Sequence, residues 1–311
     1  MDYKELKKYY IGVVVTPITP FKPSNFDLDE DAWRKFIRFL IDSGIKKGEG
    51  VIVGQSSTGE FDAMSVDERK TAMEIAVDEA KDEVPFIAGI NSTDPKISIE
   101  LAKHAEQIGA AGLMFGPPYY DAPTADEIVT FYKMIADATN LGICIYNNYF
   151  ATQADITLEI LEKLVNEVGT IIGIKEPVAD FEKIEHEIKL FGDRINILTG
   201  RGDSFEPYGS LLGVKGFVAY AYVNFLPHVA VQIWEAIKKK DWLHAKKLED
   251  GIYKVRSFMF KQPRVHYVSR AKAGMELMGL NGGTVRPFRH PISSEEKEEL
   301  KSILKELGYL S

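Results

Sequence analysis

Cysteine is nearly absent from this chain of 311 residues. The single cysteine, Cys144, cannot form an intrachain disulfide, and it lies in the apolar run "LGICIY", where it should pack as a small hydrophobic side chain. A chain that does not use disulfides fits a reducing compartment. We therefore expect a soluble, cytoplasmic protein.

Long hydrophobic runs are missing as well. The apolar run "IGVVV" near the N-terminus is too short for the core of a signal peptide and is soon followed by proline, and nothing later in the chain could span a bilayer. The formal net charge is -8, and basic residues are mixed with acidic ones, as in "SSEEKEELKSILKEL". This mixture argues against a surface that binds polyanions. We expect neither a membrane nor a nucleic acid among the partners.

Motifs of the common metal and nucleotide sites are also absent. No Walker loop is present, and no G-x-G-x-x-G follows a predicted strand, which argues against a nucleotide-binding protein. The histidines show no ligand spacing and fall mostly in predicted helices; they are His104, His186, His228, His244, His266 and His290. We therefore expect no metal ion and no cofactor. A metal-dependent lyase or hydrolase on the same fold is the alternative that this absence disfavours.

What the chain does have is a repeated alternation of strand and helix signals. Most of the short apolar runs are followed by a helix start, such as the capping boxes of Ser65 with Glu68 and of Thr124 with Glu127, or Asp94 followed by a proline. The runs, eight in number, lie at residues 11–16, 50–54, 84–90, 111–116, 142–147, 171–175, 195–200 and 214–220.

This alternation predicts the fold class. The runs are continuously apolar and the gaps between them can hold crossover helices, so the sheet should be parallel and covered by helices. Eight such units favour a closed (β/α)8 TIM barrel over a doubly wound open sheet. From about residue 226 the strand signals stop and the remaining segments are typical of helices. We predict an α/β protein in which residues 1–240 form the catalytic barrel and residues 241–311 form a C-terminal helical extension packed on it.

The ends of the predicted strands give a list of candidate site residues, because reactive groups in such a barrel lie at the C-terminal ends of its strands. The sixth predicted strand ends in Lys175 and the fifth in Tyr146. Glu176 should point away from Lys175, because side chains alternate along a strand. The other candidates lie in the segments that follow strands, namely Ser57, Thr58, Gly59, Tyr119, Tyr120, Gly200, Arg201 and Asn224.

These residue types together indicate a reaction. A lysine in a mostly apolar pocket loses the hydration of its charged form, which favours the neutral, nucleophilic amine. Such an amine can attack a ketone or aldehyde and form a Schiff base, while a tyrosine hydroxyl relays protons. The turn "SSTGE" offers backbone N–H groups and hydroxyls that suit a carboxylate. Taken alone, such a lysine is more often solvated, such a tyrosine more often packed in the core, and such a segment more often an ordinary turn. Because all of them are predicted at the same end of the barrel, the set predicts an aldolase that acts on a 2-keto acid.

An ordered set of motifs carries a family resemblance along nearly the whole chain. The motifs are "VTPITPF", "SSTGEF", "PPYYDAPT", "IYN" at the end of the fifth run, "GIKE" at the end of the sixth, and "GLNGGTVRPF" near the C-terminus. With these the chain resembles the dihydrodipicolinate synthase / N-acetylneuraminate lyase family of class I aldolases, which form a Schiff base.

The resemblance implies roles for individual residues. Lys175 would be the Schiff-base lysine and Tyr146 the residue that moves protons to and from the substrate. Ser57 would stand in a hydroxyl relay with Tyr120, which in this family is completed by a tyrosine from the adjacent subunit. Ser57 and Thr58, in the turn that continues with Gly59, would bind the carboxylate of pyruvate. The implied partners are a 2-keto acid and an aldehyde, and the implied assembly is a homotetramer built as a dimer of dimers.

One segment departs from the synthase branch of the family. In that branch the segment after the fifth strand follows a pattern that resembles Y-N-x-P-x-R. This chain has "YNNYFATQADI" there, with Tyr149 in place of the proline and Ala151 in place of the arginine. This pattern, and "NFLP" around Asn224, look more like the archaeal 2-keto-3-deoxygluconate aldolases. Arg201 in "TGRGD", next to Gly200, could supply a substitute positive charge.

We therefore expect a lyase that cleaves or condenses 2-keto-3-deoxy sugar acids. The alternatives are a 4-hydroxy-tetrahydrodipicolinate synthase and a keto-deoxy sugar acid dehydratase. A relative that only binds keto acids is disfavoured, because binding alone does not require the amine of Lys175.

Overall fold

A closed barrel of parallel strands forms the centre of the molecule. The computed structural model describes residues 1–177, 180–200, 202–219 and 221–311. Within these residues eight strands pair in sequence order and β8 closes the barrel against β1. The strands are β1 (Gly12–Val15), β2 (Gly50–Gly54), β3 (Phe86–Gly89), β4 (Gly112–Phe115), β5 (Gly142–Tyr146), β6 (Ile171–Glu176), β7 (Asn196–Thr199) and β8 (Gly216–Ala219). The expected (β/α)8 barrel is confirmed, with one strand at each predicted apolar run; only β6 extends beyond its run, by one residue, to Glu176.

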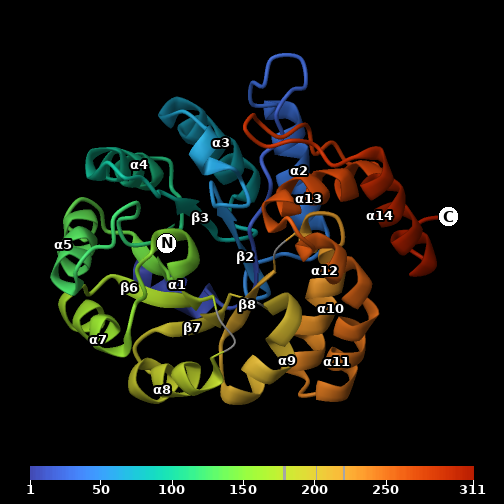
Figure 1. Cartoon of the computed structure of the whole chain (residues 1–311). Coiled ribbons are helices and arrows are strands. Elements are labelled where there is room, and N and C mark those ends of the chain that lie inside the picture. The colour runs from blue at the N-terminus through green and yellow to red at the C-terminus, as the bar shows by residue number, and fades with distance from the viewer. Residues whose placement is uncertain (178–179, 201, 220) are drawn as a thin grey trace.

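Helices surround this barrel and continue beyond its last strand (Figure 1). Those before β8 are α1 (Tyr3–Tyr9), α2 (Glu30–Asp42), α3 (Val66–Ala80), α4 (Pro95–Gln107), α5 (Ala125–Ala136), α6 (Tyr149–Thr152), α7 (Leu158–Glu167), α8 (Phe181–Phe191) and α9 (Gly202–Leu212). Those after β8 are α10 (Pro227–Lys238), α11 (Trp242–Gly251), α12 (Tyr253–Phe260), α13 (Tyr267–Leu277) and α14 (Ser294–Glu306).

The helix-start signals act as expected. The Ser65 side chain accepts from the Glu68 N–H while the Glu68 carboxylate accepts from the Ser65 N–H, and Thr124 and Glu127 form the same reciprocal pair at α5. Asp94 caps α4, whose first residue is a proline. These bonds satisfy N–H groups that a helix end otherwise leaves without partners. Short-range chemistry therefore sets where these helices begin.

The N-terminal helix closes one end of the barrel. Leu6 of α1 and Tyr10 just after it are fully buried and pack in one cluster with the inward-facing side chains of the strands, including Val14 and Val51. Cys144 belongs to the same cluster, as the sequence predicted for a small hydrophobic side chain, and burial raises the pKa of its thiol. Because α1 also contacts β5 and β6, only the opposite end of the barrel interior is left for a pocket.

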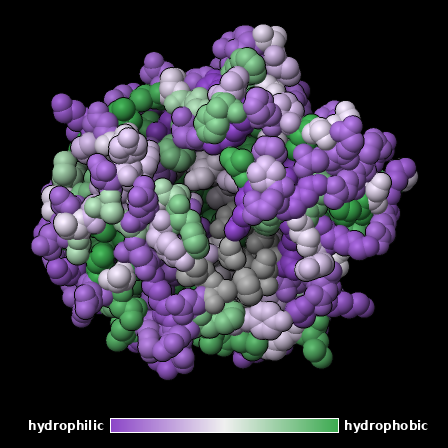
Figure 2. All heavy atoms as spheres, viewed as in Figure 1, coloured by the Kyte–Doolittle hydropathy of each residue, from purple (hydrophilic) through white to green (hydrophobic). Residues whose placement is uncertain are grey.

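The C-terminal helices lie beside the barrel at the right of Figure 1. The predicted boundary at residues 240 and 241 falls between the end of α10 and the start of α11, and it stays a prediction. α14 buries Leu300 and Leu304, while that side of the molecule is mostly hydrophilic in Figure 2. Among the described residues, no helix combines the length and the apolarity that a membrane span requires.

Candidate active site

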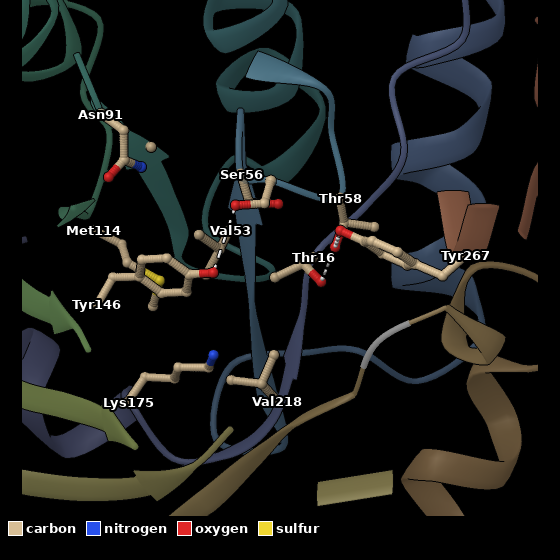
Figure 3. A pocket seen from close by; sticks show the side chains of 12 residues that line it. Thr16, Val53, Ser56, Thr58, Asn91, Met114, Tyr146, Lys175, Val218 and Tyr267 are labelled. Carbon is tan, nitrogen blue, oxygen red and sulfur yellow. Dashed lines mark hydrogen bonds between the residues drawn. The ribbon is translucent and has the colours of Figure 1, made fainter. Parts of the chain in front are cut away.

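A pocket lies at the C-terminal ends of the barrel strands. With its open mouth included it encloses about 460 Å³, a size suited to a small molecule. Its walls come from most of the strands and the loops after them, and from α13 (Figure 3). The lining residues are Thr16, Val53, Ser56, Ser57, Thr58, Gly89, Asn91, Met114, Tyr146, Lys175, Val218 and Tyr267. Four residues from the sequence-based list, Ser57, Thr58, Tyr146 and Lys175, are thus brought together.

Lys175 reaches into this pocket from β6. Only 1% of the residue is exposed, and apolar side chains such as Val53, Met114 and Val218 line the pocket with it. Across the β5–β6 pair Lys175 is in register with Tyr146, and its Nζ lies 4.6 Å from the centre of the Tyr146 ring. An amine in such surroundings has lost most of its water, which disfavours its charged form.

Glu176 points to the other side of the strand, as alternation predicted. Its carboxylate is fully buried, accepts from Asn147 Nδ2 at 2.8 Å, and lies 3.2 Å from Lys183 Nζ. Burial raises the pKa of Glu176 against the opposing effects of Lys183 and Asn147. The carboxylate next in sequence to Lys175 therefore pairs outside the pocket.

Hydroxyl groups line the pocket beside Lys175. The Tyr146 hydroxyl accepts from Asn148 Nδ2 at 2.5 Å and lies 3.5 Å from Ser57 Oγ. Figure 3 shows the Tyr146 ring and Lys175 projecting into the same space from neighbouring strands. A connected pair of hydroxyls can take up and pass on a proton.

A second group of hydroxyls lies across the pocket. Thr16 Oγ1 donates to Thr58 Oγ1 at 3.2 Å, and Thr58 Oγ1 lies 3.5 Å from the Tyr267 hydroxyl. Thr16 follows β1, Thr58 lies in the turn after β2, and Tyr267 is the first residue of α13. The C-terminal helices therefore contribute to the pocket itself.

Three other predicted residues shape the site without lining it. Gly59 is buried in the turn, where its carbonyl accepts from Thr19 Oγ1 at 2.8 Å. Gly200 lies so close to Lys175 that a Cβ on it would be 2.8 Å from the lysine Nζ. Asn224 braces the segment after β1, because its Oδ1 accepts from the Ile18 N–H at 2.8 Å. None of the three presents a side chain to the pocket.

The remaining predicted residues that the structure describes, Tyr119 among them, do not line the pocket. Tyr120 follows β4 with a positive φ of 96°, and 82% of it is exposed outside the pocket. Ala151 is an exposed residue of the short helix α6, also outside the pocket lining. Arg201 lies outside the described residues.

Some lining residues were missed by the sequence reasoning. Thr16 directly follows β1 and Asn91 comes two residues after the end of β3, so the strand-end rule that found Lys175 would also have found them. Asn148 does not line the pocket but donates to the Tyr146 hydroxyl; it comes two residues after Tyr146 and could have been found in the same way. Tyr267 had no such signal, because it begins a helix about 90 residues after Lys175 and reaches the pocket only through tertiary packing.

The charge of the pocket is concentrated at one point. Among the described lining residues no side chain is a carboxylate or a guanidinium, and Lys175 is the only amine. The other polar groups are neutral hydroxyls and the amide of Asn91. The part of the chain that the structure describes also holds no cluster of three His, Cys, Asp or Glu residues suited to a metal ion. Chemistry at this site therefore centres on one amine flanked by hydroxyls.

Comparisons with known proteins agree along almost the whole chain. Residues 10–307 match the model of the "Dihydrodipicolinate synthetase family". A 4-hydroxy-tetrahydrodipicolinate synthase of Thermodesulfovibrio yellowstonii is 32% identical over 303 residues, which cover 96% of this chain and 99% of that protein.

Comparison with solved structures also finds members of this family that are similar over almost the whole chain. The dihydrodipicolinate synthase from Acinetobacter baumannii complexed with pyruvate has a TM-score of 0.86 and 26% identity, over 96% of this chain and 99% of that one. YagE, a prophage protein from E. coli K12 belonging to the dihydrodipicolinic acid synthase family and solved in complex with pyruvate, has a TM-score of 0.87 and 26% identity over the same shares.

Proposed function

Because the chain belongs to the dihydrodipicolinate synthetase family, whose members are pyruvate-dependent class I aldolases and lyases, we propose that it acts on 2-keto-3-deoxy sugar acids. In this proposal it reversibly cleaves or forms the bond between C3 and C4, with pyruvate and an aldehyde as the products of cleavage. The observation that carries the proposal is a buried Lys175 beside Tyr146, in a pocket whose other described polar groups are neutral.

Lys175 provides the nucleophile in this proposal. Its Nζ attacks the 2-keto carbon, water leaves, and an imine forms between the lysine and the substrate. The protonated imine draws electrons from the neighbouring bond and makes cleavage between C3 and C4 possible. Burial supports this role because it disfavours the ammonium form, which cannot attack a carbonyl.

Tyr146 moves the protons of the reaction. In cleavage its hydroxyl oxygen takes the proton from the C4 hydroxyl as the aldehyde leaves, and the enamine that remains on Lys175 is then protonated at C3. Hydrolysis of the imine releases pyruvate and restores the amine. The contact of 3.5 Å between Tyr146 and Ser57 supports a path by which the proton reaches other groups.

The turn after β2 holds the substrate carboxylate. Ser57 and Thr58 line the pocket with hydroxyls, and the backbone N–H groups of such a turn suit an anion. Binding there would fix the 2-keto carbon against Lys175.

The neutral lining favours a sugar acid as substrate. Aspartate semialdehyde carries a carboxylate and an ammonium group on the part that reacts with pyruvate, and charged groups bind best to opposite charges. The distal part of a 2-keto-3-deoxy sugar acid carries only hydroxyls, which match the hydroxyls and amide that line the pocket. Ala151 stands where the synthase pattern has its arginine and adds no positive charge.

A second candidate function is favoured by the relatives. The curated relatives are named mostly as 4-hydroxy-tetrahydrodipicolinate synthases, at about 30% identity. On that reading the chain would condense pyruvate with aspartate semialdehyde, with a positive charge supplied from another position such as Arg201.

A homotetramer built as a dimer of dimers completes the proposal. The 82% exposure of Tyr120 supports a role for this side chain toward a neighbouring subunit, where it would join the hydroxyl relay of that subunit's Ser57 and Tyr146. Subunit contact would also cover an aromatic side chain that the single chain leaves in water.

Trapping with pyruvate and sodium borohydride tests the central step. Reduction of the imine should add the mass of the reduced pyruvyl group to one site, and peptide mapping should find it on Lys175. Lys175→Ala should keep the circular dichroism of the barrel and form no adduct. An adduct on any other lysine, or full turnover by Lys175→Ala, would refute the Schiff-base assignment.

The substrate is tested by comparing two reactions under matched conditions. Release of pyruvate from 2-keto-3-deoxygluconate should be faster by at least about tenfold than condensation of pyruvate with aspartate semialdehyde, since a missing charge partner costs about that much. Faster condensation would favour the synthase, and loss of water from the sugar acid without pyruvate release would favour a dehydratase.

A further inference from the structure

The turn after β2 ends in a backbone conformation that its residue type disfavours. Glu60, its last residue, has a positive φ of 56°, in the left-handed region that side chains other than glycine rarely adopt. Glu60 is also fully buried, although a carboxylate normally stays in water. Contacts from outside the turn must therefore hold it.

Those contacts come from the C-terminal helix α13 and the segment after it. Lys272 of α13 places its Nζ 2.8 Å from Glu60 Oε1, and the two side chains are only 4% and 0% exposed. The other oxygen of Glu60 accepts from the Arg286 N–H at 3.3 Å and lies 3.7 Å from Arg289 Nη1. Burial lowers the pKa of Lys272 to about 8 and Glu60 opposes this effect, so the lysine is mostly charged at neutral pH.

The same lysine fixes the segment on which the turn rests. Lys272 Nζ donates to the carbonyl oxygen of Thr19 at 2.8 Å, and Thr19 Oγ1 in turn donates to the carbonyl oxygen of Gly59 at 2.8 Å. Gly59 and Glu60 directly follow Thr58, which lines the pocket. Lys272 thus contacts the turn in two ways. It pairs directly with the side chain of Glu60, the last residue of the turn, and through Thr19 it is linked to the backbone carbonyl of Gly59.

Stability alone does not account for this arrangement. A buried ion pair loses the hydration of two charges, and apolar replacements of similar size are often at least as stable. The turn, however, must present its N–H groups and hydroxyls in one orientation to bind an anion. A close ion pair whose lysine also donates to the backbone carbonyl oxygens of Thr19 and Thr284 can impose one orientation.

We propose that Lys272 and Glu60 are positioning residues that hold the turn of Ser57 to Glu60 ready for the carboxylate of the keto acid, so that α13 is a working part of the substrate site. This inference rests on the proposed function, because it takes that turn to be the carboxylate site. Neither residue touches the substrate; both act through Thr58 and its neighbours.

The test uses variants of the full-length chain and a control of similar burial. Lys272→Met together with Glu60→Gln removes both charges, so that no unpaired charge stays buried, and the methionine can still pack on Phe21, whose ring centre lies 4.7 Å from the lysine Nζ. Lys272→Arg keeps the charge. Arg256→Met is the control. Arg256 of α12 pairs with Glu249 of α11 at 2.8 Å, the side chains are 10% and 2% exposed, and neither residue lines the pocket.

Three quantities are measured for each variant. The pyruvate concentration that gives half-maximal borohydride trapping reports affinity, the trapping rate at saturating pyruvate reports the chemical step, and the unfolding midpoint in urea reports stability. We expect the double variant to need about tenfold more pyruvate, while its saturated rate stays within about threefold of the parent rate. Lys272→Arg should recover part of the affinity. Arg256→Met should lower the urea midpoint and leave the half-maximal concentration unchanged.

Three results would overturn the inference. The first is a double variant that binds pyruvate as tightly as the parent, and the second is a loss of affinity by Arg256→Met of the same size as that of the double variant. The third is a saturated rate of the double variant that falls as steeply as its affinity, since that would indicate general damage to the site. A parent protein that forms no adduct on Lys175 would instead refute the proposed function, and with it the premise of the inference.

Discussion

Gly200 directly follows β7 and lies against the end of the Lys175 side chain. A Cβ at this position would lie 2.8 Å from Lys175 Nζ and 2.5 Å from the carbonyl oxygen of Glu176, both far inside van der Waals contact. The missing side chain therefore makes the space that the amine occupies. At the scale of single residues, the site therefore depends on the lack of a side chain at Gly200 as well as on the side chains that line the pocket.

Gly200→Ala should disturb the amine directly. Since neither Lys175 nor the backbone of Glu176 can move far inside the barrel, we expect a loss of stability of about 1 to 3 kcal/mol and a fall of at least about tenfold in the rate of borohydride trapping. Gly169→Ala is the matched control, because a Cβ there meets nothing within 4 Å. Equal trapping rates for the two variants would contradict this account of Gly200.

At the scale of secondary-structure elements, a buried carboxyl joins β7 to α9. Glu206 of α9 is fully buried and accepts from Thr199 Oγ1 at 2.7 Å and from Ser210 Oγ at 2.6 Å. Burial raises the pKa of Glu206 from about 4.5 to about 8, because the charged form loses its hydration. The strand end that precedes Gly200 is thus tied to its helix by a group that holds a proton at neutral pH.

This carboxyl makes the stability depend on pH with a definite sign. Between about pH 4.5 and 8 the folded chain keeps the Glu206 proton and the unfolded chain releases it, so the stability present at low pH is lost as the pH rises. The free energy of unfolding in urea should fall across this window by on the order of a few kcal/mol. Glu206→Gln should make the slope shallower.

The control for this pH dependence is an exposed acid that titrates lower. Glu185 pairs with Lys189 on the surface of α8, and this pairing lowers its pKa below the usual value. Glu185→Gln should therefore leave the slope between pH 5 and 8 as it is in the parent. If Glu206→Gln behaves in the same way, Glu206 does not hold a proton in this window.

At the scale of the whole molecule, the barrel collects side chains that are far apart in sequence at one end. Helix α1 packs at the other end of the interior, α13 adds Tyr267 and holds the turn after β2, and Tyr120 extends outward with 82% of its surface exposed. A single chain thus holds a pocket with most of its proposed groups, while Tyr120 lies outside the lining of that pocket.

Mixing subunits tests the proposed role of Tyr120 toward a neighbouring subunit. Lys175→Ala and Tyr120→Phe should each reduce activity by at least about tenfold when alone. Co-expressed, they should recover part of the activity, because a mixed pair contains one site with an intact lysine and a tyrosine supplied by the other subunit.

Lys175→Ala co-expressed with Tyr146→Phe is the control for this experiment. Tyr146 and Lys175 lie on adjacent strands of one barrel, so exchange between subunits cannot restore a complete site for that pair. If the Tyr120 mixture stays as inactive as this control, Tyr120 does not act across a subunit boundary.

The sequence by itself determined the architecture of this protein, the position of its lysine and the family. Continuous apolar runs require burial on both faces, and eight of them separated by helix starts leave a parallel barrel as the simplest way to provide it. Strand periodicity then turned Lys175 inward and Glu176 outward, because side chains alternate along every strand.

Only the tertiary structure decided which of the candidates meet. Asn224 and Gly59 hydrogen-bond to the segment after β1 and do not present side chains to the pocket. In the folded chain Tyr267 contacts Thr58, and Lys272 contacts Glu60. Neither pair could be read from the sequence, because each joins residues more than 200 positions apart and no local pattern encodes such a contact. The physical reason is that periodicity fixes which face of an element is buried, whereas packing between distant elements fixes what that face touches.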